Sequence, residues 1–147
     1  MSGFPFSQFT VVLATTNTTN NSTFTSAAMD SIGGKAMRVI VKLGAIAAGA
    51  TMTVCKLQSS STSGGTYADV TGAALTAFPA DTDDNKLIIF EFDLLNGSTK
   101  DRFYKLVVTT GGAANSAIDT VIAEVLNLSV EPPSAANTAS GAFVVRF

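Results

Sequence analysis

The segment AMRVIVKL, residues Ala36–Leu43, decides the fold of this chain. Every second residue in it is apolar, namely Met37, Val39, Val41 and Leu43. Arg38 and Lys42 lie between them. An extended chain points successive side chains to opposite faces, so this period of two separates an apolar face from a basic one. The segment therefore predicts a half-buried antiparallel strand.

Six further segments have the character of β-strands. They are FTVVLA (Phe9–Ala14), TMTVCKLQ (Thr51–Gln58), TYADV (Thr66–Val70), KLIIFEFDLL (86–95), DRFYKLVVTT (101–110) and DTVIAEVLNLSV (119–130). The alternation is clearest in two of them, where one face carries Ile88, Phe90, Phe92 and Leu94, or Tyr104, Leu106 and Val108. The last segment tolerates a helix, but its β-branched residues Val121, Ile122 and Val125 favour a strand.

Short strands at regular spacing, with turn signals between them, predict an all-β fold. We expect a single domain over residues 1–147, an antiparallel β-sandwich of jelly-roll or immunoglobulin-like type with roughly eight strands and extended terminal arms. The core is expected at about residues 9–131, and residues 132–147 are expected to form a linker and a C-terminal arm. Strands do not alternate with helices, which argues against a parallel sheet.

The stretch KLQSSSTSGGTYADVTGA, residues Lys56–Ala73, joins two of these strands. Ser59–Gly65 is typical of a hairpin connection, in which Gly64 and Gly65 are expected to supply positive φ angles. A phosphate-binding loop is the alternative for a segment rich in Gly and Ser, but it requires a helix to follow. Because this segment leads back into a strand, the pattern favours the hairpin.

The composition argues against catalysis. The chain has no histidine, so the usual general base and the usual catalytic triads are missing. Glycosidases use a pair of carboxylates, but Glu91, Asp93 and Glu124 lie in predicted strands without special spacing, and solvated strand faces account for them. A reactive thiol needs a basic or histidine partner, and the chain has no histidine, so Cys55, the only cysteine, is expected to be a small buried hydrophobe. We expect no enzyme activity, no catalytic residues and no cofactor.

The acidic segment DTDDN, residues 81–85, is the best candidate for a metal site. Its oxygen ligands at alternating positions resemble the start of a calcium loop. Such a loop has glycine at its sixth position and glutamate at its twelfth, whereas this chain has Lys86 and Phe92 there. We expect a solvated loop and no metal ligands, with a weak calcium site as the alternative.

Charge and hydropathy argue against two classes of partner. The net charge is −2 and no basic stripe occurs, so we expect no binding of nucleic acid. The most apolar stretch, LGAIAAGATMTV, is too short to cross a bilayer as a helix, so we expect no membrane partner. The N-terminal segment MSGFPFSQFTVVLATT lacks the basic and apolar regions of a signal peptide, which predicts synthesis and use without export.

Several segments resemble small head proteins of tailed bacteriophages. They are VIVKLGAIAAGATMTVCKLQSSSTSGGTYADVTGA (Val39–Ala73), the acidic loop, DRFYKLVVTT and VIAEVLNLSVEPP, and the resemblance covers roughly Ser26 to Pro133. Members of this group are capsid decoration, or cement, proteins with β-sandwich folds that sit outside the shell and clamp neighbouring capsomers. The resemblance implies a structural virion protein, made in the host cytoplasm, with the major capsid protein as its partner. It also implies a homotrimer, since shells offer local threefold sites.

A function of another class is a carbohydrate- or receptor-binding β-sandwich module on a head fibre or tail appendage. A sugar-binding module is expected to present aromatic side chains in its loops. The chain has no tryptophan and two tyrosines, and its loops consist mostly of Ser, Thr, Gly, Ala and Asp. This composition favours the capsid protein.

The two ends of the chain hold five of its ten phenylalanines, and EPPSAANTASGA precedes the last apolar residues with the composition of a linker. We expect candidate subunit or capsid contacts at Phe4, Phe6, Phe9, Phe143, Val145 and Phe147. The N-terminal segment is expected to contain a strand of the domain itself. The C-terminal segment GAFVVRF either forms an edge strand on its own sandwich or adds a strand to another subunit.

Overall fold

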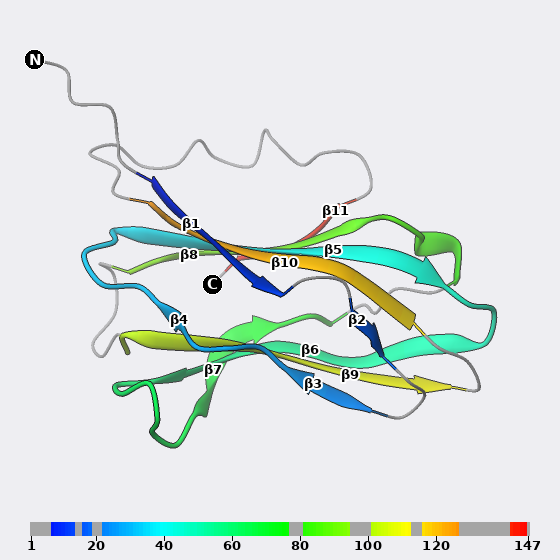
Figure 1. Ribbon diagram of the computed structural model, residues 1–147, viewed down its shortest axis with the longest axis horizontal. Coiled ribbons are helices and arrows are strands. Elements are labelled where there is room, and N and C mark those ends of the chain that lie inside the picture. Colours follow the sequence, from blue (N-terminus) through cyan, green and yellow to red (C-terminus); the bar gives the residue numbers. More distant parts are fainter. Residues whose placement is uncertain are drawn as a thin grey trace, which may run out of the picture.

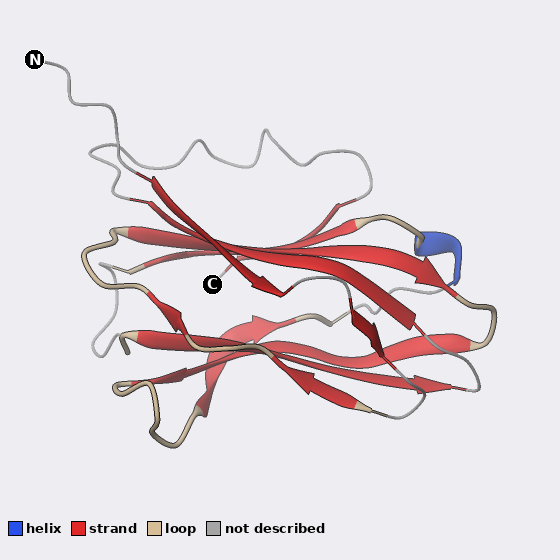
Figure 2. Ribbon diagram, in the orientation of Figure 1, coloured by secondary structure: helices blue, strands red, loops and turns tan. Residues whose placement is uncertain are grey.

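The computed structural model describes residues 7–13, 16–18, 22–76, 81–94, 101–112, 116–126 and 142–146. In this part of the chain the fold is all-β, and two sheets stack face to face (Figure 1). Figure 2 shows that strands dominate the described residues, with one short 3-10 helix, η1 (Asp81–Asp83), at one end. The predicted β-sandwich is confirmed.

One sheet, called sheet A, has six strands. In spatial order they are β1 (Ser7–Leu13), β10 (Ser116–Leu126), β5 (Ala36–Ile46), β8 (Leu87–Asp93) and β11 (Ala142–Arg146), and β2 (Thr16–Thr18) also pairs with β10. All these pairs are antiparallel except β8 with β11, which run parallel. β5 lies at the centre of the sheet and is paired on both sides.

The other sheet, called sheet B, has five strands. In spatial order they are β3 (Thr23–Thr25), β9 (Phe103–Gly112), β6 (Ala50–Ser60) and β7 (Ala68–Ala74), and β4 (Met29–Asp30) also pairs with β9. Every pair in sheet B is antiparallel. Of the eleven strands in the described residues, eight have five or more residues, in agreement with the expected number.

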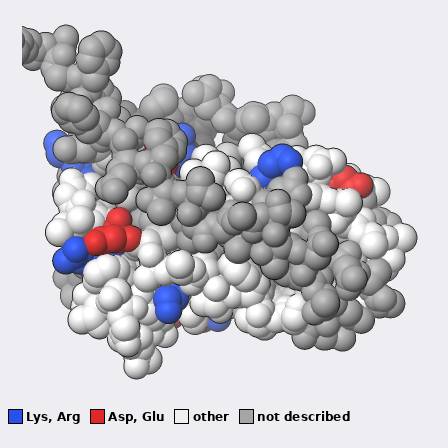
Figure 3. All heavy atoms as spheres, in the orientation of Figure 1, with Lys and Arg blue, Asp and Glu red and all other residues white. Residues whose placement is uncertain are grey.

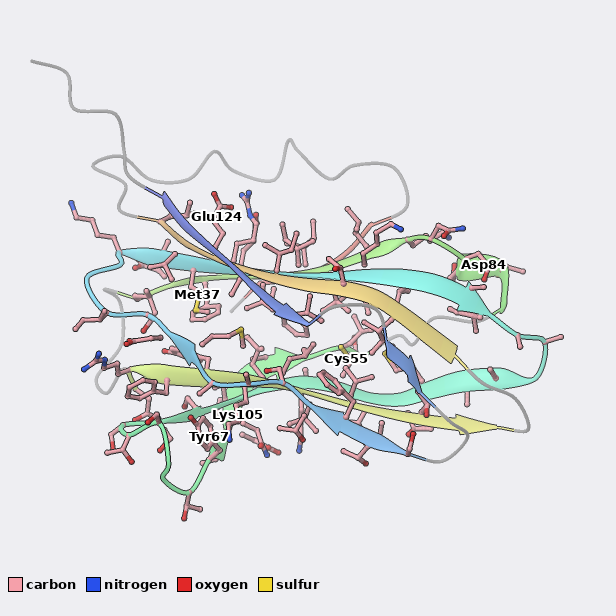
Figure 4. The ribbon with its side chains drawn as sticks, viewed as in Figure 1. Met37, Cys55, Tyr67, Asp84, Lys105 and Glu124 are labelled. Atoms are coloured by element: carbon pink, nitrogen blue, oxygen red, sulfur yellow. The ribbon has the colours of Figure 1, made fainter. Side chains whose placement is uncertain are left out.

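The apolar faces predicted from alternation form the core. On β5, the residues that are at most 1% exposed include Met37, Val39, Val41 and Leu43. Figure 4 shows Met37 of sheet A and Cys55 of sheet B between the two sheets. The rings of Phe92 on β8 and Tyr104 on β9 meet across the core, with centroids 4.9 Å apart. Removing this apolar surface from water contributes most of the free energy that holds the two sheets together.

The strands lie where the sequence predicts them, but their ends differ from the predicted bounds by a few residues, as β10 and β7 illustrate. The strand expected at 119–130 is present as β10 (Ser116–Leu126), which begins three residues earlier, and residues 127–130 of the expected strand lie outside the described residues. β7 begins at Ala68 instead of Thr66 and continues to Ala74. Its register with β6 shifts near Gly72, which has a φ of 80°. Glycine tolerates this left-handed conformation, so β7 bulges beyond the end of the predicted strand at Val70.

The hairpin between β6 and β7 is confirmed, but the expected role of its glycines is wrong. Among the described residues, the glycines with positive φ are Gly33, Gly49, Gly72 and Gly112, so neither Gly64 nor Gly65 belongs to this set. Gly65 provides space instead, because a Cβ there would lie 2.4 Å from Thr62 Oγ1 and 2.6 Å from Ser60 Oγ. A Cβ at Gly64 would meet nothing within 4 Å.

This difference predicts unequal effects of two neighbouring substitutions. Gly65→Ala is expected to lower the free energy of unfolding by about 1–3 kcal/mol, because the added methyl group forces the side chains of Ser60 and Thr62 in the turn to move. Gly64→Ala is expected to leave it unchanged or raise it by up to ~1 kcal/mol, because alanine restricts the unfolded chain. Urea unfolding followed by circular dichroism measures both values. Equal destabilisation by the two variants would contradict this account of the turn.

Candidate functional site

The predicted contact residues that the structure describes lie on the two outermost strands of sheet A. β1 and β11 form opposite edges of this sheet (Figure 1), so these two terminal strands do not converge on one site. Phe9 is in β1, opposite Glu124 in the register, and Phe143 and Val145 are in β11. Phe4, Phe6 and Phe147 lie outside the described residues. The expected strand in the N-terminal segment is confirmed as β1.

The C-terminal segment forms an edge strand of its own domain. β11 runs parallel to β8, and the register sets Phe143 opposite Ile88 and Val145 opposite Phe90. Both partners on β8 are fully buried, at 0% exposed. Of the two arrangements expected for this segment, the single chain has the one in which the strand stays on its own sandwich. The expected linker lies outside the described residues.

A row of charged side chains crosses the outer face of sheet A. Arg38 is in the central strand β5, and its register partners are Glu91 on β8 and Glu124 on β10. Arg38 Nη2 lies 2.7 Å from Glu91 Oε1, and its Nε donates a hydrogen bond of 2.8 Å to the same oxygen. Arg38 Nη1 lies 3.5 Å from Glu124 Oε2. One arginine thus bridges carboxylates on both neighbouring strands.

Glu124 is the most buried member of this charge row. The residue is 8% exposed, and Figure 4 shows its side chain on the outer side of sheet A. The prediction that solvated strand faces account for Glu91, Asp93 and Glu124 is therefore wrong for Glu124. A carboxylate that has lost water needs a charged partner, and Arg38 supplies it. Alternation alone does not reveal this pair, because it depends on the register between strands.

A second polar cluster lies on the outer face of sheet B, beside the hairpin. Lys105 Nζ lies 4.1 Å from the centre of the Tyr67 ring, which is a cation–π contact between two residues labelled in Figure 4. Asp69 Oδ2 is 2.6 Å from Lys56 Nζ, and its Oδ1 accepts a hydrogen bond of 2.8 Å from Gln58 Nε2. The hydrogen bonds from Lys56 and Gln58 hold the pKa of Asp69 below its usual value. These contacts fasten the hairpin to β6 and β9.

The acidic segment is fixed to the end of β5 (Figure 4). Asp84 Oδ1 accepts a hydrogen bond of 2.7 Å from the Ile46 amide, and Asp83 Oδ1 lies 2.6 Å from Lys86 Nζ. Among the described residues, no three or more His, Cys, Asp or Glu side chains form a group that could hold a metal ion. The described contacts of this segment are those of a structural loop.

Cys55 is buried in β6, as expected. Its exposed fraction is 1%, and burial raises the pKa of its thiol to about 12. The thiol is therefore neutral at physiological pH, and it does not supply the thiolate that nucleophilic chemistry requires.

One exposed apolar side chain stands on a well-fixed turn at an end of the sandwich. Ile32 is 62% exposed, and it is the one exposed large hydrophobic residue among those described. The Asp30 carboxylate accepts a hydrogen bond of 3.0 Å from the Ile32 amide and two from Arg102, of 2.8 and 2.7 Å. The hydrogen bond from Arg102 lowers the pKa of Asp30. A single exposed side chain is normal on a soluble protein and does not define a binding patch.

Charged side chains are sparse among the described residues on the face shown in Figure 3. On the face shown in Figure 3, the described Lys and Arg side chains lie in small separate groups and form no continuous basic area. Within the described residues, no helix has the length and apolar character needed to cross a membrane.

Comparisons with known proteins identify no relative of the chain. No family model matches it, and no curated protein or solved structure is significantly similar to it. The features that bear on function are therefore the sandwich, the two polar clusters and the sheet edges.

Removal of the shared arginine is expected to destabilise the domain. Arg38→Met leaves Glu91 and Glu124 without their common cation, and we expect a loss of about 1–3 kcal/mol, less than for a fully buried pair because Arg38 and Glu91 are partly exposed. Adding Glu124→Gln should restore part of the loss, since an amide carries no charge to bury. Urea unfolding of both single variants and the double variant measures the coupling. Strictly additive losses would contradict a shared arginine.

The buried thiol predicts slow labelling and a defined alkaline response. A thiol reagent is expected to modify native Cys55 far more slowly than the unfolded chain. Stability should fall as the pH rises from 9.0 toward about 12, because the unfolded thiol loses its proton in this range while the folded one keeps it. Cys55→Ala should flatten this decline, although Tyr104, whose pKa burial also raises to about 12, retains its own contribution. Labelling of the native protein at the unfolded rate would refute the assignment.

Proposed function

We propose that this protein decorates and stabilises a bacteriophage capsid by binding between subunits of the major capsid protein. It acts as a structural virion protein on the capsid surface, after synthesis in the host cytoplasm, with no catalytic step and no cofactor. It assembles as a homotrimer, which matches the local threefold sites of a shell. A β-sandwich is the fold expected for such a protein, and it is the fold of this chain.

The observation that carries the proposal is the arrangement of the segments that resemble phage head proteins. KLQSSSTSGGTYADVTGA contains the end of β6, the hairpin and most of β7, and DRFYKLVVTT contains most of β9. β7, β6 and β9 are consecutive neighbours in sheet B. These two segments of the resemblance therefore form one continuous three-stranded unit in sheet B, while the remaining strand segments of the resemblance lie in β5 and β10 of sheet A.

The surface chemistry suits a large contact with another protein. Charged residues make up 14% of the chain, so a covered surface contains few ions that must lose water. On sheet A, Arg38 is paired with two acids, and on sheet B, Lys56 is paired with Asp69. Charges that already have partners cost less to cover than isolated ones. A rigid sandwich also loses little conformational entropy when it docks.

The Tyr67 ring bears on the alternative, a carbohydrate- or receptor-binding module. An open aromatic face is the usual contact for a sugar ring. Here the Lys105 ammonium lies over the ring, and the Tyr67 hydroxyl donates a hydrogen bond of 3.0 Å to the Ser63 carbonyl. A sugar would have to displace the lysine from that face. The capsid-binding function is therefore the better supported of the two.

Rebinding to depleted particles tests the proposal. Purified protein is expected to attach to phage particles stripped of it, to saturate at a fixed number of copies per shell, and to make the shell more resistant to heat. Electron cryomicroscopy should then show its density over subunit boundaries on the outside of the capsid. Density on a tail or fibre, or binding to glycans without binding to capsids, would support the alternative and overturn capsid decoration.

The C-terminal apolar positions are expected to contribute to assembly. Deleting Ser140–Phe147 should weaken self-association or shell attachment while the sandwich still folds, because burial of two phenylalanines and a valine is worth on the order of several kcal/mol before ordering entropy is subtracted. Phe143→Ser combined with Val145→Ser should act in the same direction. Val144→Ser, at the intervening position, is the matched control.

Melting curves, mass in solution and particle binding give the outcome for these variants. If the truncated chain assembles and binds as the full-length chain does, the contact lies elsewhere. A truncated chain that does not fold would show that the segment belongs to the core.

A further inference from the structure

β11 differs from the other described strands in the direction of its pairing and in the length of the chain that precedes it. Its pairing with β8 is the one parallel pairing among the described residues, and β8 is its only neighbour in sheet A. The 15 residues from 127 to 141 separate the end of β10 from the start of β11. β11 is therefore an edge strand that follows a long connection.

The edge of β8 matches this strand chemically. Ile88 and Phe90, both fully buried, lie opposite Phe143 and Val145 in the register. One position further along, Glu91 lies opposite Arg146. In this register, apolar residues of β11 lie opposite apolar residues of β8, and a basic residue lies opposite an acidic one.

In the register, Arg146 occupies the next position after Glu91 along this row of charged residues. Across four adjacent strands the register sets side by side, in order, Glu124, Arg38, Glu91 and Arg146. The charges alternate in sign, and without the last arginine the row has two acids and one base. A slip of one residue would move Arg146 away from Glu91 and exchange the two faces of β11. The row therefore favours a single register for this strand.

An empty β8 edge would be unfavourable. Without β11, backbone N–H and C=O groups along Leu87–Glu91 would lose their partners, and an edge of this kind attracts another strand. If β11 dissociates from β8, the strand that best takes its place is one with the same order of apolar and basic positions. A second copy of the chain carries such a strand.

The length of the connection does not restrict β11 to its own β8. β10 and β11 run in the same direction, since both are parallel in direction to β8. Through β5, Leu126 is level with Asp93, whereas Ala142 is level with Leu87. The chain must return about 20 Å along the strands and about 14 Å across them, or about 25 Å in all. A connection of this length can span about 50 Å.

We propose that β11 is exchanged between copies of this chain, so that β11 of one copy pairs with β8 of another in the register seen within the single chain. Exchange keeps the β8–β11 contacts and costs mainly the association of two chains. Pairing within one chain has an effective concentration on the order of millimolar, so exchange dominates where copies are crowded, as on a shell. This inference rests on the proposed function in one respect: the exchange of β11 explains the self-association that the proposed function includes.

Split cysteine pairs test the exchange in the full-length protein. In a Cys55→Ala background, one chain carries Ile89→Cys and another carries Val144→Cys, at positions opposite each other in the register. Adjacent strands are about 4.8 Å apart, which suits a disulfide, and neither chain can form this bond alone. We expect a mixed disulfide that increases with protein concentration. It should exceed several-fold the product with Ala142→Cys, whose Cα lies about 8 Å from that of residue 89.

A chain that carries both Ile89→Cys and Val144→Cys is the control, and it should close the bond within itself at high dilution. If this chain closes its bond while the mixed chains cross-link no more than the mismatched pair at any concentration, β11 stays on its own sheet and the proposal is wrong. If the control chain does not close its bond, the register is wrong and the proposal fails with it. Because no particles are present, capsid binding is judged separately by its own experiment.

Discussion

The burial of one face of β5 is the constraint on which the rest of the domain depends. Val39 and Val41 in this central strand are fully buried between the sheets. Because β5 is paired on both sides, its position determines where β8 and β10 lie, and with them the rest of sheet A. The other face of β5 carries Arg38, which ties the same three strands together from outside. Apolar burial supplies the free energy, and the charge row favours one register.

Local patterns in the sequence predict the strands but not their partners. Alternation reports the two faces of a strand, so the inward residues of β5, β8 and β9 and the all-β class follow from it. The contact of Arg38 with Glu124 depends on register between distant segments, which explains why Glu124 was wrongly expected to be exposed. Gly65 shows another limit, since glycine offers both a permissive φ and a missing Cβ, and the sequence does not indicate which the turn uses.

The two sheets differ at their edges. β7, at one edge of sheet B, is bulged against β6 and includes Gly72 with a φ of 80°. A bulged edge resists the addition of a further strand. β8 and β11 in sheet A pair without a register shift. On the proposed function, the edge of sheet A is therefore suited to contacts between copies, and the face of sheet B, where the hairpin and the DRFYKLVVTT segment lie, is suited to the shell.

The order in which the ribosome makes the strands has a consequence for the pairing of β8 with β11. β8 ends at Asp93 and β11 begins at Ala142, so the ribosome makes β9, β10 and the long connection before the last strand of sheet A exists. At about 5–20 residues per second, a nascent chain displays the β8 edge for a few seconds before its own β11 emerges. On the proposed exchange, the β8 edge of a new chain is therefore available to the β11 of a finished copy before its own β11 can compete for it.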